Sequence, residues 1–367
     1  MDIWPVRGNP AEVVDGLRSW LFEGDTSARA LVVETSGSTG APKRVLLTRK
    51  ALLASVHASA ARMGATGPWV LAVPPTFVAG VQVIARSLAA GHEPILLERD
   101  GWPEGSGWFV SLVPTQLTRM LDDPAGLAAL QRAHTVLLGG GPIGPALRAR
   151  AAGAGVHVVA SYGSAETAGG CVYDGLPLDG VAVALGDAGR IRIAGPTLFT
   201  EYVDQADLTR GTLVDGWFLT SDAGRIDEDG RLVVIGRIDD VIVSGGLNVP
   251  GPAVAERLLA HPSIAAVEVL GVPDAEWGNR VVAFVVVAPG VSRLADARTS
   301  TTGVPSVVEV RGAPATSLET TLRAWVAEAH PRAWAPRQFV VLDEIPLLPN
   351  GKPDRRGLLS LVEEVAR

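Results

Sequence analysis

The amino-acid sequence predicts an α/β protein, in which a large N-terminal domain precedes a small α+β C-terminal domain. From residue 30 to about residue 160, short apolar segments alternate with helix-like stretches. This alternation is typical of a mostly parallel sheet covered by helices, with ligands at the C-terminal ends of its strands. From residue 181 to residue 237, short apolar segments instead follow one another across turns such as Asp229-Gly230. That pattern favours a small antiparallel β unit at the end of the large domain.

Local signals predict the elements of the large domain in order. Asn9-Pro10 is typical of a helix cap followed by proline at the first helical position, and apolar residues recur with helical spacing from Val13 to Leu21. Beyond this first helix, short apolar runs predict strands and the stretches between them predict helices. The predicted strands are residues 30–33, 69–73, 94–97, 108–113, 135–138 and 156–160, and the helices are residues 49–63, 79–90, 114–121 and 145–152.

The second domain is predicted to begin near Asp239, which gives an N-terminal domain at residues 1–238 and a C-terminal domain at residues 239–367. Residues 289–316 are rich in Ser, Thr, Gly and Pro, so we expect an exposed, mobile loop there. The β unit is predicted to contain strands at residues 191–194, 217–219 and 232–235, and the C-terminal domain helices at 254–259 and 318–328 with strands at 266–272, 281–287 and 339–342.

Composition excludes several classes of protein. A length of 367 residues suggests two or three domains. The net charge of −7, without a block of Lys and Arg, gives no electrostatic footprint for nucleic acid. The single cysteine, Cys171, excludes an internal disulfide framework. The N-terminus has no signal pattern and no apolar run approaches the roughly 20 residues of a membrane helix, so we expect a cytoplasmic protein without stable membrane insertion.

Residues 35–44, Thr-Ser-Gly-Ser-Thr-Gly-Ala-Pro-Lys-Arg, predict polyphosphate binding. Glycine lets the backbone approach an anion, and successive N–H groups in such a turn form a concavity for phosphate oxygens. Two residues separate Gly37 from Gly40 and Arg44 follows Lys43, so this is not the ordinary kinase or ATPase loop. A flexible surface turn is the plainer alternative. The predicted phosphate-binding residues are Thr35, Ser36, Gly37, Ser38, Thr39, Gly40 and Lys43.

With this loop, further motifs follow in the order found in the acyl-adenylate-forming superfamily, which includes acyl-CoA synthetases, luciferases and peptide-synthetase adenylation domains. The chain resembles that superfamily across residues 35–355. The motifs are Ser161-Tyr162-Gly163-Ser164-Ala165-Glu166, Thr220-Ser221-Asp222, Gly236-Arg237-Ile238-Asp239-Asp240 with Ser244-Gly245-Gly246, and Pro349-Asn350-Gly351-Lys352-Pro353-Asp354-Arg355.

Within the superfamily the chain most resembles the o-succinylbenzoate–CoA ligase family of menaquinone biosynthesis, in a short form. The stretches that carry this likeness are residues 111–117, 138–143 and 166–175. The resemblance implies a ligase that uses ATP, Mg²⁺ and CoA and forms o-succinylbenzoyl-CoA through an acyl-adenylate. Its implied partners are small molecules, and it allows a homodimer. Only 34 residues precede the phosphate loop, where long members carry a large N-terminal region.

The resemblance also implies roles for single residues. Lys352 would bridge the substrate carboxylate and the α-phosphate, and Glu166 would be the catalytic magnesium ligand. Asp239 would be the inter-domain hinge, while Gly245 and Gly246 would line a tunnel for the pantetheine arm. The plainer alternatives are a solvated lysine for Lys352, a helix-start carboxylate for Glu166, and an ordinary β-turn for the two glycines. The remaining implied ATP-binding residues are Gly140, Gly141, Pro142, Ser161, Tyr162, Gly163, Asp222 and Arg237, and the implied acyl pocket is Phe77, Thr115, Gln116, Gly139 and Gly163.

Two features favour alternatives. Ala165 stands where the superfamily usually has a hydroxyl that contacts the α-phosphate, so we expect slower adenylation or compensation by Ser164 or Thr167, and a non-catalytic nucleotide-binding relative stays open. Residues 139–144 satisfy G-x-G-x-x-G, which suggests a dinucleotide-binding oxidoreductase, but the next predicted strand ends without the required acid. A ligase for another aryl or fatty acid, or for a carrier protein, is the nearest alternative function.

Overall fold

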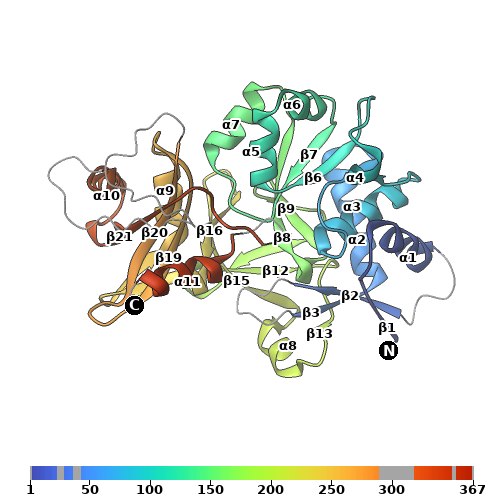
Figure 1. Cartoon of the computed structure of the whole chain (residues 1–367). Helices are drawn as coiled ribbons and strands as arrows, with labels where there is room; N and C mark the ends of the chain where they lie inside the picture. Colours follow the sequence, from blue (N-terminus) through green and yellow to red (C-terminus); the bar gives the residue numbers. More distant parts are fainter. Residues whose placement is uncertain (1, 23–28, 36–42, 289–317, 349–352, 366–367) are drawn as a thin grey trace. The chain divides into compact units, whose positions relative to one another are not determined.

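The computed structural model of the chain describes residues 2–22, 29–35, 43–288, 318–348 and 353–365. The chain forms two compact units (Figure 1). The first contains Met1–Thr220 and Gly224–Val233, and the second contains Ser221–Ala223 and Val234–Leu348 with the C-terminal helix. The predicted mobile loop at residues 289–316 lies outside the described residues.

The first unit is built around a seven-stranded sheet with the strand order β10-β9-β8-β7-β6-β4-β5. Its strands from β5 to β8 run parallel, whereas β9 and β10 pair antiparallel at one end. This arrangement confirms the predicted mostly parallel sheet. The strands are β4 (Trp69–Leu71), β5 (Ile95–Leu96), β6 (Phe109–Leu112), β7 (Thr135–Leu138), β8 (Val158–Ser164), β9 (Gly169–Tyr173) and β10 (Leu176–Pro177).

Helices cover both faces of this sheet because successive strand residues point to opposite sides. In β6, for example, Phe109 belongs to a core cluster with α2 and α3, whereas Val110 belongs to a cluster with α5, α6 and α7. Figure 1 shows α5, α6 and α7 beside β6 and β7. The helices are α1 (Pro10–Phe22), α2 (Arg49–Met63), α3 (Val78–Ala89), α4 (Leu97–Asp100), α5 (Pro114–Asp122), α6 (Pro124–Leu130) and α7 (Pro145–Gly153).

The first helix begins at the predicted cap, and α2 begins after a capping threonine. The Glu12 N–H donates to Asn9 Oδ1 at 3.1 Å before α1, and the Ala51 N–H donates to Thr48 Oγ1 at 3.1 Å at the start of α2. Gly64 ends α2 in the left-handed conformation at φ 68°, which glycine adopts at little cost. Thr48 and Gly64 therefore set the start and the end of α2, the helix that follows the predicted phosphate loop and β3.

One strand prediction needs correction. The segment predicted as strand 30–33 is β2 (Arg29–Glu34), and it lies in a separate four-stranded sheet with the order β1-β2-β3-β13 instead of in the parallel sheet. There β2 pairs antiparallel with β3 (Arg44–Leu47) and parallel with β1 (Asp2–Pro5). The fourth strand, β13 (Glu201–Tyr202), pairs antiparallel with β3. The phosphate loop therefore connects β2 to its antiparallel neighbour β3 and does not lead from the mostly parallel seven-stranded sheet into a helix.

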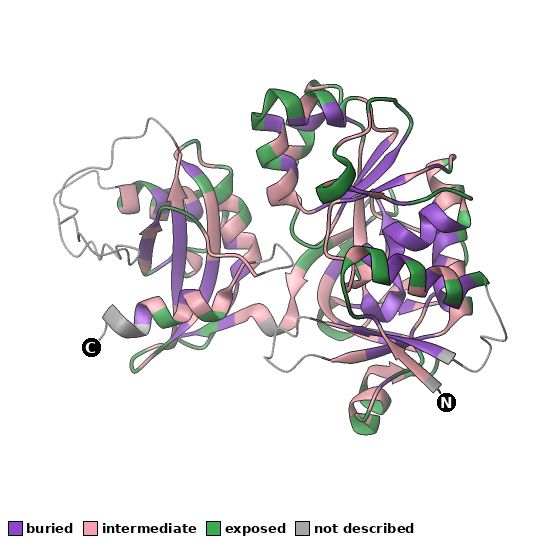
Figure 2. Ribbon diagram, turned by 45° about the vertical axis from the view of Figure 1, so that its right-hand side comes forward, coloured by how far each residue is buried: buried purple, intermediate pink, exposed green. Residues whose placement is uncertain are grey.

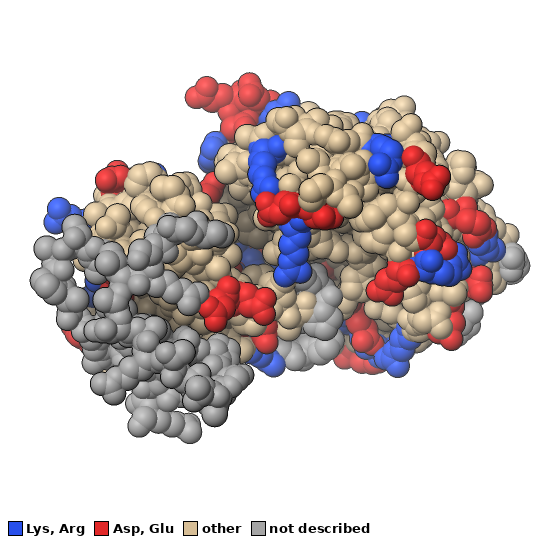
Figure 3. Space-filling model, turned by 45° about the horizontal axis from the view of Figure 1, so that its top comes forward, with Lys and Arg blue, Asp and Glu red and all other residues tan. Residues whose placement is uncertain are grey.

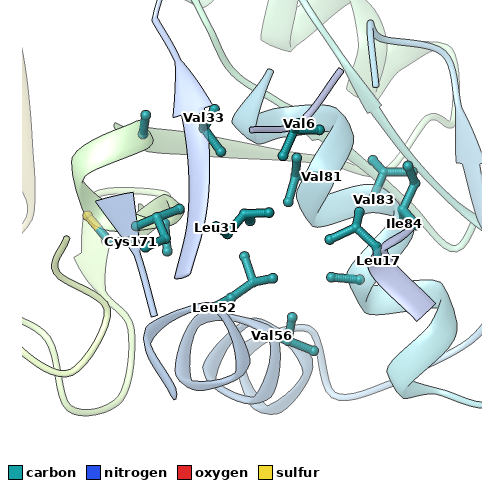
Figure 4. Close-up of a cluster of buried hydrophobic side chains, with 14 of the residues drawn as sticks. Val6, Leu17, Leu31, Val33, Leu52, Val56, Val81, Val83, Ile84 and Cys171 are labelled. Carbon is teal, nitrogen blue, oxygen red and sulfur yellow. The ribbon is translucent and has the colours of Figure 1, made fainter. Parts of the chain in front are cut away.

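The main core of the first unit joins this small sheet to the helices. Leu31 of β2, Leu52 of α2 and Val81 of α3 are all fully buried and belong to one cluster. Figure 4 shows these side chains converging with Leu17 of α1, and Cys171 lies at the edge of the same group. In Figure 2 the buried residues form continuous bands through the strands and through α3. The elements that bracket the phosphate loop are thus fixed by a common apolar core.

The predicted antiparallel β unit is also present. Its strand order is β11-β12-β15-β14, and β16 pairs with β15. The pairs β11–β12 and β14–β15 are antiparallel, which confirms the prediction from the turn-separated apolar segments. The elements are β11 (Ala182–Leu185), β12 (Arg190–Ala194), α8 (Ala206–Thr212), β14 (Leu213–Val214), β15 (Trp217–Ile226) and β16 (Leu232–Arg237).

The second unit is an α+β structure with the strand order β18-β17-β20-β19, in which β21 pairs parallel with β20. Strand β20 is apolar on both faces because Val281, Ala283 and Val285 pack with α9 and α10, while Val282 and Phe284 pack with α11. The elements are β17 (Val241–Ser244), β18 (Leu247–Pro250), α9 (Gly251–Leu259), β19 (Ile264–Asp274), β20 (Gly278–Val287), α10 (Leu318–Ala329), β21 (Gln338–Leu342) and α11 (Arg355–Val365).

Charged side chains of both signs are interspersed on the face of the molecule shown in Figure 3. Among the residues described, no helix is long and apolar enough to cross a bilayer.

Candidate active site

The two ends of the predicted phosphate loop are held together at the end of the β2–β3 hairpin. The Thr35 N–H donates to the Lys43 carbonyl at 2.9 Å, and the Lys43 N–H donates to Thr35 Oγ1 at 3.3 Å. The Glu34–Arg44 pair closes the antiparallel register just before them. The predicted residues Ser36, Gly37, Ser38, Thr39 and Gly40 lie outside the described part of the chain. The structure therefore fixes where the loop begins and ends.

The segment predicted to hold adenine is strand β8 itself, and the glycine-rich turn after β7 lies directly beside it. A Cβ at Gly139 would lie 3.1 Å from the Ser161 carbonyl oxygen, so glycine permits this approach. The adjoining Gly140 has φ 80°, which favours glycine, and the turn continues through Gly141 and Pro142. Two segments predicted to contact the nucleotide are thus neighbours in the first unit.

Gly163 is required for a reason that the sequence does not reveal. A Cβ at this position would lie 2.2 Å from the Gly169 carbonyl oxygen on the neighbouring strand β9. The register of β8 and β9 shifts between Tyr162 and Gly163, and the two backbones approach closely there. Packing of strand against strand thus explains this glycine, whereas the predicted approach to adenine and to the acyl group stays a prediction. Tyr162 is half-buried and packs against the main core cluster.

Glu166 is held through both its side chain and its main chain. It lies in a single turn of 3-10 helix, Ala165–Thr167, directly after β8, and only 7% of its surface is exposed. The Tyr202 hydroxyl donates to Glu166 Oε1 at 2.7 Å. The backbone of Glu166 is also held, because the Phe199 N–H donates to its carbonyl at 2.8 Å. The segment before and within β13 therefore fixes both the main chain and the carboxylate of Glu166.

Tyr202 contacts two of the predicted site residues, although the sequence analysis did not single it out. It is 2% exposed, and the Nζ of Lys43 lies 5.3 Å from the centre of its ring. Burial, and then the negative charge of Glu166, raise the pKa of the Tyr202 hydroxyl far above its ordinary value, so it stays a hydrogen-bond donor at neutral pH. The tyrosine follows Thr200-Glu201 without any local motif, and its partner is 36 residues away. No signal in the surrounding sequence indicates this contact.

The surroundings of Ala165 bear on the expected compensation for its missing hydroxyl. Thr167 is fully buried, and its Oγ1 accepts from the Ser164 N–H at 2.9 Å and lies 2.7 Å from the Gly169 carbonyl oxygen. Its hydroxyl is therefore already engaged. The buried Ser164 Oγ has no hydrogen-bond partner within the part of the chain described. Of the two predicted substitutes, Ser164 is thus the one whose hydroxyl has no partner among the described residues.

The predicted acyl-pocket residues come from two helix starts of the first unit. Phe77 precedes α3 and is half-buried, and Thr115 and Gln116 lie in the first turn of α5. The Gln116 side chain already makes two local bonds, because Oε1 accepts from the Val113 N–H at 3.0 Å and Nε2 donates to the Ala72 carbonyl at 2.7 Å. Gln116 therefore ties α5 to the end of β4, and its predicted contact with substrate stays a prediction.

The second unit contains the remaining predicted residues that the structure describes. Asp222 lies in β15 and Arg237 ends β16, and both are partly buried. Asp239 lies in a single turn of 3-10 helix between β16 and β17. Lys352 lies outside the described residues. On either side of its loop, Leu347 pairs with Pro353, and the Asp354 N–H donates to the Pro346 carbonyl at 2.8 Å.

Gly245 and Gly246 form the two-residue turn between β17 and β18. Ser244 pairs with Leu247, and the glycines have φ 57° and φ 77°. Two successive positive φ values define a hairpin turn that favours glycine. A Cβ at Gly245 would also lie 2.7 Å from the Trp277 ring. The β-turn that was the plainer interpretation thus explains both glycines, and their place in a pantetheine tunnel stays a prediction.

Arg355, the last residue of the lysine-loop motif, links the start of α11 to the segment next to the hinge. Its Nη1 lies 2.6 Å from Asp240 Oδ2, and its Nε lies 2.6 Å from Glu268 Oε1. Both carboxylates are largely buried, with side chains 19% and 13% exposed. Burial raises the pKa of Glu268, although the positive charge of Arg355 opposes that rise. This ion-pair network connects Asp239's neighbour to the helix that follows Lys352.

The donor chemistry around Glu166 fits a magnesium ion that arrives with a nucleotide. Within the described ranges, no three His, Cys, Asp or Glu residues are grouped so that they could hold a metal by themselves. Magnesium at a nucleotide site usually takes one or two carboxylates and completes its shell with phosphate oxygens and water. The buried Glu166 carboxylate, and the Ser164 hydroxyl that has no partner among the described residues, are oxygen donors of this kind.

Comparison with known proteins agrees with this geometry. The family model for the AMP-binding enzyme matches residues 23–203, and the model for the AMP-binding enzyme C-terminal domain matches residues 253–352. A probable 2-succinylbenzoate–CoA ligase from Mycobacterium tuberculosis is 40% identical over 344 residues, which cover 90% of this chain and 84% of that protein. A 2-succinylbenzoate–CoA ligase from Enterococcus faecalis is 32% identical over 297 residues, which cover 71% of this chain and 60% of that protein.

A solved structure extends the likeness to the fold. The o-succinylbenzoate CoA synthetase from Bacillus subtilis, in complex with the acyl-adenylate intermediate OSB-AMP, matches with a TM-score of 0.70 and 26% identity. The match covers 89% of this chain and 68% of that one. The same synthetase is also known in complex with ATP and a magnesium ion. Two family models and relatives that align along most of its length show that this chain belongs to the AMP-binding enzyme family.

Proposed function

We propose that the chain is an ATP-dependent acid–CoA ligase that forms o-succinylbenzoyl-CoA through an acyl-adenylate, as a step of menaquinone biosynthesis. The observation that carries this proposal is the 40% identity over 90% of the chain to the mycobacterial protein named as such a ligase. The buried Glu166, which Tyr202 links to Lys43 at the end of the phosphate loop, supports the nucleotide half of the reaction. Since ATP and CoA are both substrates, the proposal places the reaction in the cytoplasm.

The reaction has two steps. In the first, a carboxylate oxygen of the acid attacks the α-phosphorus of ATP, and the bond to pyrophosphate breaks. In the second, the thiol of CoA attacks the acyl carbon and loses its proton, and AMP leaves. The first step brings two negatively charged groups together, so positioning and neutralisation of charge provide most of the catalysis.

In the first unit, the proposed residues hold the phosphates. Glu166 would hold magnesium through a carboxylate oxygen, and magnesium when bound neutralises charge on the phosphate oxygens. Lys43 and the loop that begins at Thr35 would contact the same phosphates. Ser164, whose Oγ is buried and unpartnered among the described residues, would replace the hydroxyl that Ala165 lacks only in part, because it lies one position earlier in the chain.

In the second unit, Asp222 and Arg237 would bind the ribose, and Lys352 would bridge the substrate carboxylate and the α-phosphate. Asp239 would be the hinge about which the C-terminal domain, proposed as residues 239–367, turns between the two steps. Such a closure often limits turnover. A homodimer is a further proposal, which the molar mass in solution would test.

The experiment measures pyrophosphate release and thioester formation with ATP and magnesium for o-succinylbenzoate, benzoate, cinnamate and a medium-chain fatty acid, each with and without CoA. The proposal predicts CoA-dependent thioester formation with o-succinylbenzoate alone. Turnover of another acid would keep the mechanism and reject the substrate. No turnover of any acid, with ATP still bound, would instead favour the non-catalytic nucleotide-binding relative.

A further inference from the structure

We infer that Tyr202 is a positioning residue, which orients the Glu166 carboxylate for the magnesium–nucleotide complex and holds the Nζ of Lys43 over its own ring. This inference rests on the proposed function, since it assigns a role within the nucleotide-binding site. Tyr202 belongs to none of the motifs by which the site was predicted. It contacts side chains from two of them, the phosphate loop and the segment that ends in Glu166.

The contact with Glu166 is short and fixed on both sides. The hydroxyl of Tyr202 lies 2.7 Å from Glu166 Oε1, and both residues are buried, at 2% and 7% exposure. The Tyr202 ring packs against Phe199 at 4.8 Å between ring centres, and the Phe199 N–H donates to the Glu166 carbonyl. The tyrosine ring cannot swing away without disturbing this packing, so the hydroxyl has one direction in which to donate.

The contact with Lys43 follows from the pairing of β13 with β3. Tyr202 lies opposite Val45 in that pair, two residues from Lys43. The Val203 N–H donates to the Arg44 carbonyl and the Thr200 N–H to the Leu46 carbonyl, each at 2.9 Å, which extends the pairing on both sides. The Nζ of Lys43 therefore lies over the Tyr202 ring at 5.3 Å, a distance at which a ring face attracts a cation.

A neutral donor suits a carboxylate that has to bind a cation. Two carboxylate oxygens offer about four acceptor directions, and a hydroxyl occupies one of them without cancelling the negative charge. An arginine or lysine in the same place would compete with the metal for that charge. Groups that hydrogen-bond a metal ligand orient it, and their loss typically lowers metal affinity about 10–100-fold.

The test is binding of ATP to the full chain, measured by calorimetry over a range of magnesium concentrations and without any acid substrate. For Tyr202→Phe we expect the half-saturating magnesium concentration to rise about 10–100-fold. Binding of ATP in EDTA should not change. Adding Tyr202→Phe to Glu166→Gln should have no further effect, because the tyrosine acts through that carboxylate.

Tyr173→Phe is the matched control. Tyr173 is equally buried, at 1% exposure, and belongs to the same core cluster, but its hydroxyl bonds Ser59 Oγ at 2.8 Å. Tyr202→Phe loses one buried hydrogen bond and Tyr173→Phe loses two, because Arg86 Nη2 also donates to the Tyr173 hydroxyl at 3.0 Å. Both variants should therefore melt at a lower temperature, yet only Tyr202→Phe should change the magnesium requirement. Glu166→Asp gives a second test should Tyr202→Phe not fold. The shorter side chain keeps the negative charge but withdraws the carboxylate from the Tyr202 hydroxyl. We expect a similar rise in the half-saturating magnesium concentration.

The inference is overturned if Tyr202→Phe, or Glu166→Asp in its place, has the half-saturating magnesium concentration of the unaltered protein. It is also overturned if the effects of Tyr202→Phe and Glu166→Gln simply add. Binding of ATP by the unaltered protein distinguishes failure of the proposed function from failure of this inference alone. If that protein binds ATP with no dependence on magnesium, the proposed function and the inference fail together.

Discussion

Glu166 in the first unit and Glu268 in the second are both largely buried, yet they are held in opposite ways. Glu166 accepts a hydrogen bond from a neutral tyrosine at 2.7 Å, whereas Glu268 pairs with the guanidinium of Arg355 at 2.6 Å. Burial of a carboxylate without a partner is costly, so each needs a donor. A neutral donor leaves the charge of Glu166 unneutralised, as the proposed binding of magnesium requires. The charge of Glu268 is instead neutralised by Arg355 within the fold.

The contrast extends to the elements that each contact connects. Tyr202 links the segment after β8 to the end of the phosphate loop. Arg355 links α11 to Asp240 beside the proposed hinge and to β19 through Glu268. The first arrangement suits a site that recognises an anion with its cation, and the second suits a rigid connection within the C-terminal unit.

The largest expected effect is on the rate of adenylation, and it comes from removing the negative charge of Glu166. Glu166→Gln keeps the shape of the side chain and its hydrogen bond with Tyr202, so the fold should persist. We expect adenylation to slow by about 10²–10³-fold, the usual cost of one electrostatic group at such a site. Single-turnover formation of the adenylate measures this. Glu268→Gln is the control, and a similar loss there would remove the distinction between the two carboxylates.

The second prediction concerns stability. Arg355→Met leaves Asp240 and Glu268 as neighbouring carboxylates without their shared cation. Breaking a buried ion pair costs about 3–5 kcal/mol, and partial exposure of Arg355 should reduce this to about 1–3 kcal/mol. Chemical denaturation gives the value. Arg210→Met removes an exposed partner of Asp207 and should change little. Equal losses in the two variants would show that the Arg355 network contributes no more than a surface pair.

The third prediction concerns the hydroxyl that Ala165 lacks. Ala165→Thr should speed adenylation by about tenfold, if the new hydroxyl makes a charge-assisted hydrogen bond worth about 1.5 kcal/mol. Ala165→Val has the same shape without the hydroxyl and controls for crowding at this buried position. An unchanged rate in Ala165→Thr, or an equal change in both variants, would mean that no such bond is missing.

The smallest effect is a difference in pH dependence. Burial raises the folded-state pKa of Glu268 above its unfolded value of about 4.3. A carboxyl with a raised pKa stabilises the fold fully below the unfolded pKa, and that contribution falls as the pH rises through the folded pKa. The unfolding free energy of the unaltered protein should therefore fall relative to Glu268→Gln as the pH rises from about 4. A constant or rising difference would contradict the assigned direction.

The parts of the fold that could be predicted are those with local signals. The parallel strands, the cap of α1, and the antiparallel β unit each follow from periodicity or turn residues close in sequence. The β2–β3 pairing could not be predicted because the four-residue strand Arg44–Leu47 reads as the end of a glycine-rich loop. A strand of four residues can be assigned only once its pairing partner is known. The apolar pattern of β2 does not specify which strand β2 pairs with.

The site shows the same division. The order of its motifs predicts Glu166, Asp222 and Arg237 as site residues, because each lies within a distinctive run of residues. Tyr202 was missed because its role depends on a contact 36 residues away. Gly245 and Gly246 illustrate the reverse case, since a local turn explains glycines that the resemblance had assigned to a ligand. Local patterns thus locate motifs, but only the fold shows which side chains orient them.

The measurement that tests the account most directly is detection by mass spectrometry of the o-succinylbenzoyl-adenylate formed from ATP, magnesium and the acid, without CoA. The account predicts that the unaltered protein and Glu268→Gln form this adenylate, whereas Glu166→Gln forms little or none. Absence of the adenylate from the unaltered protein, with ATP bound, would contradict the proposed reaction. Equal formation by Glu166→Gln would contradict the role of its carboxylate.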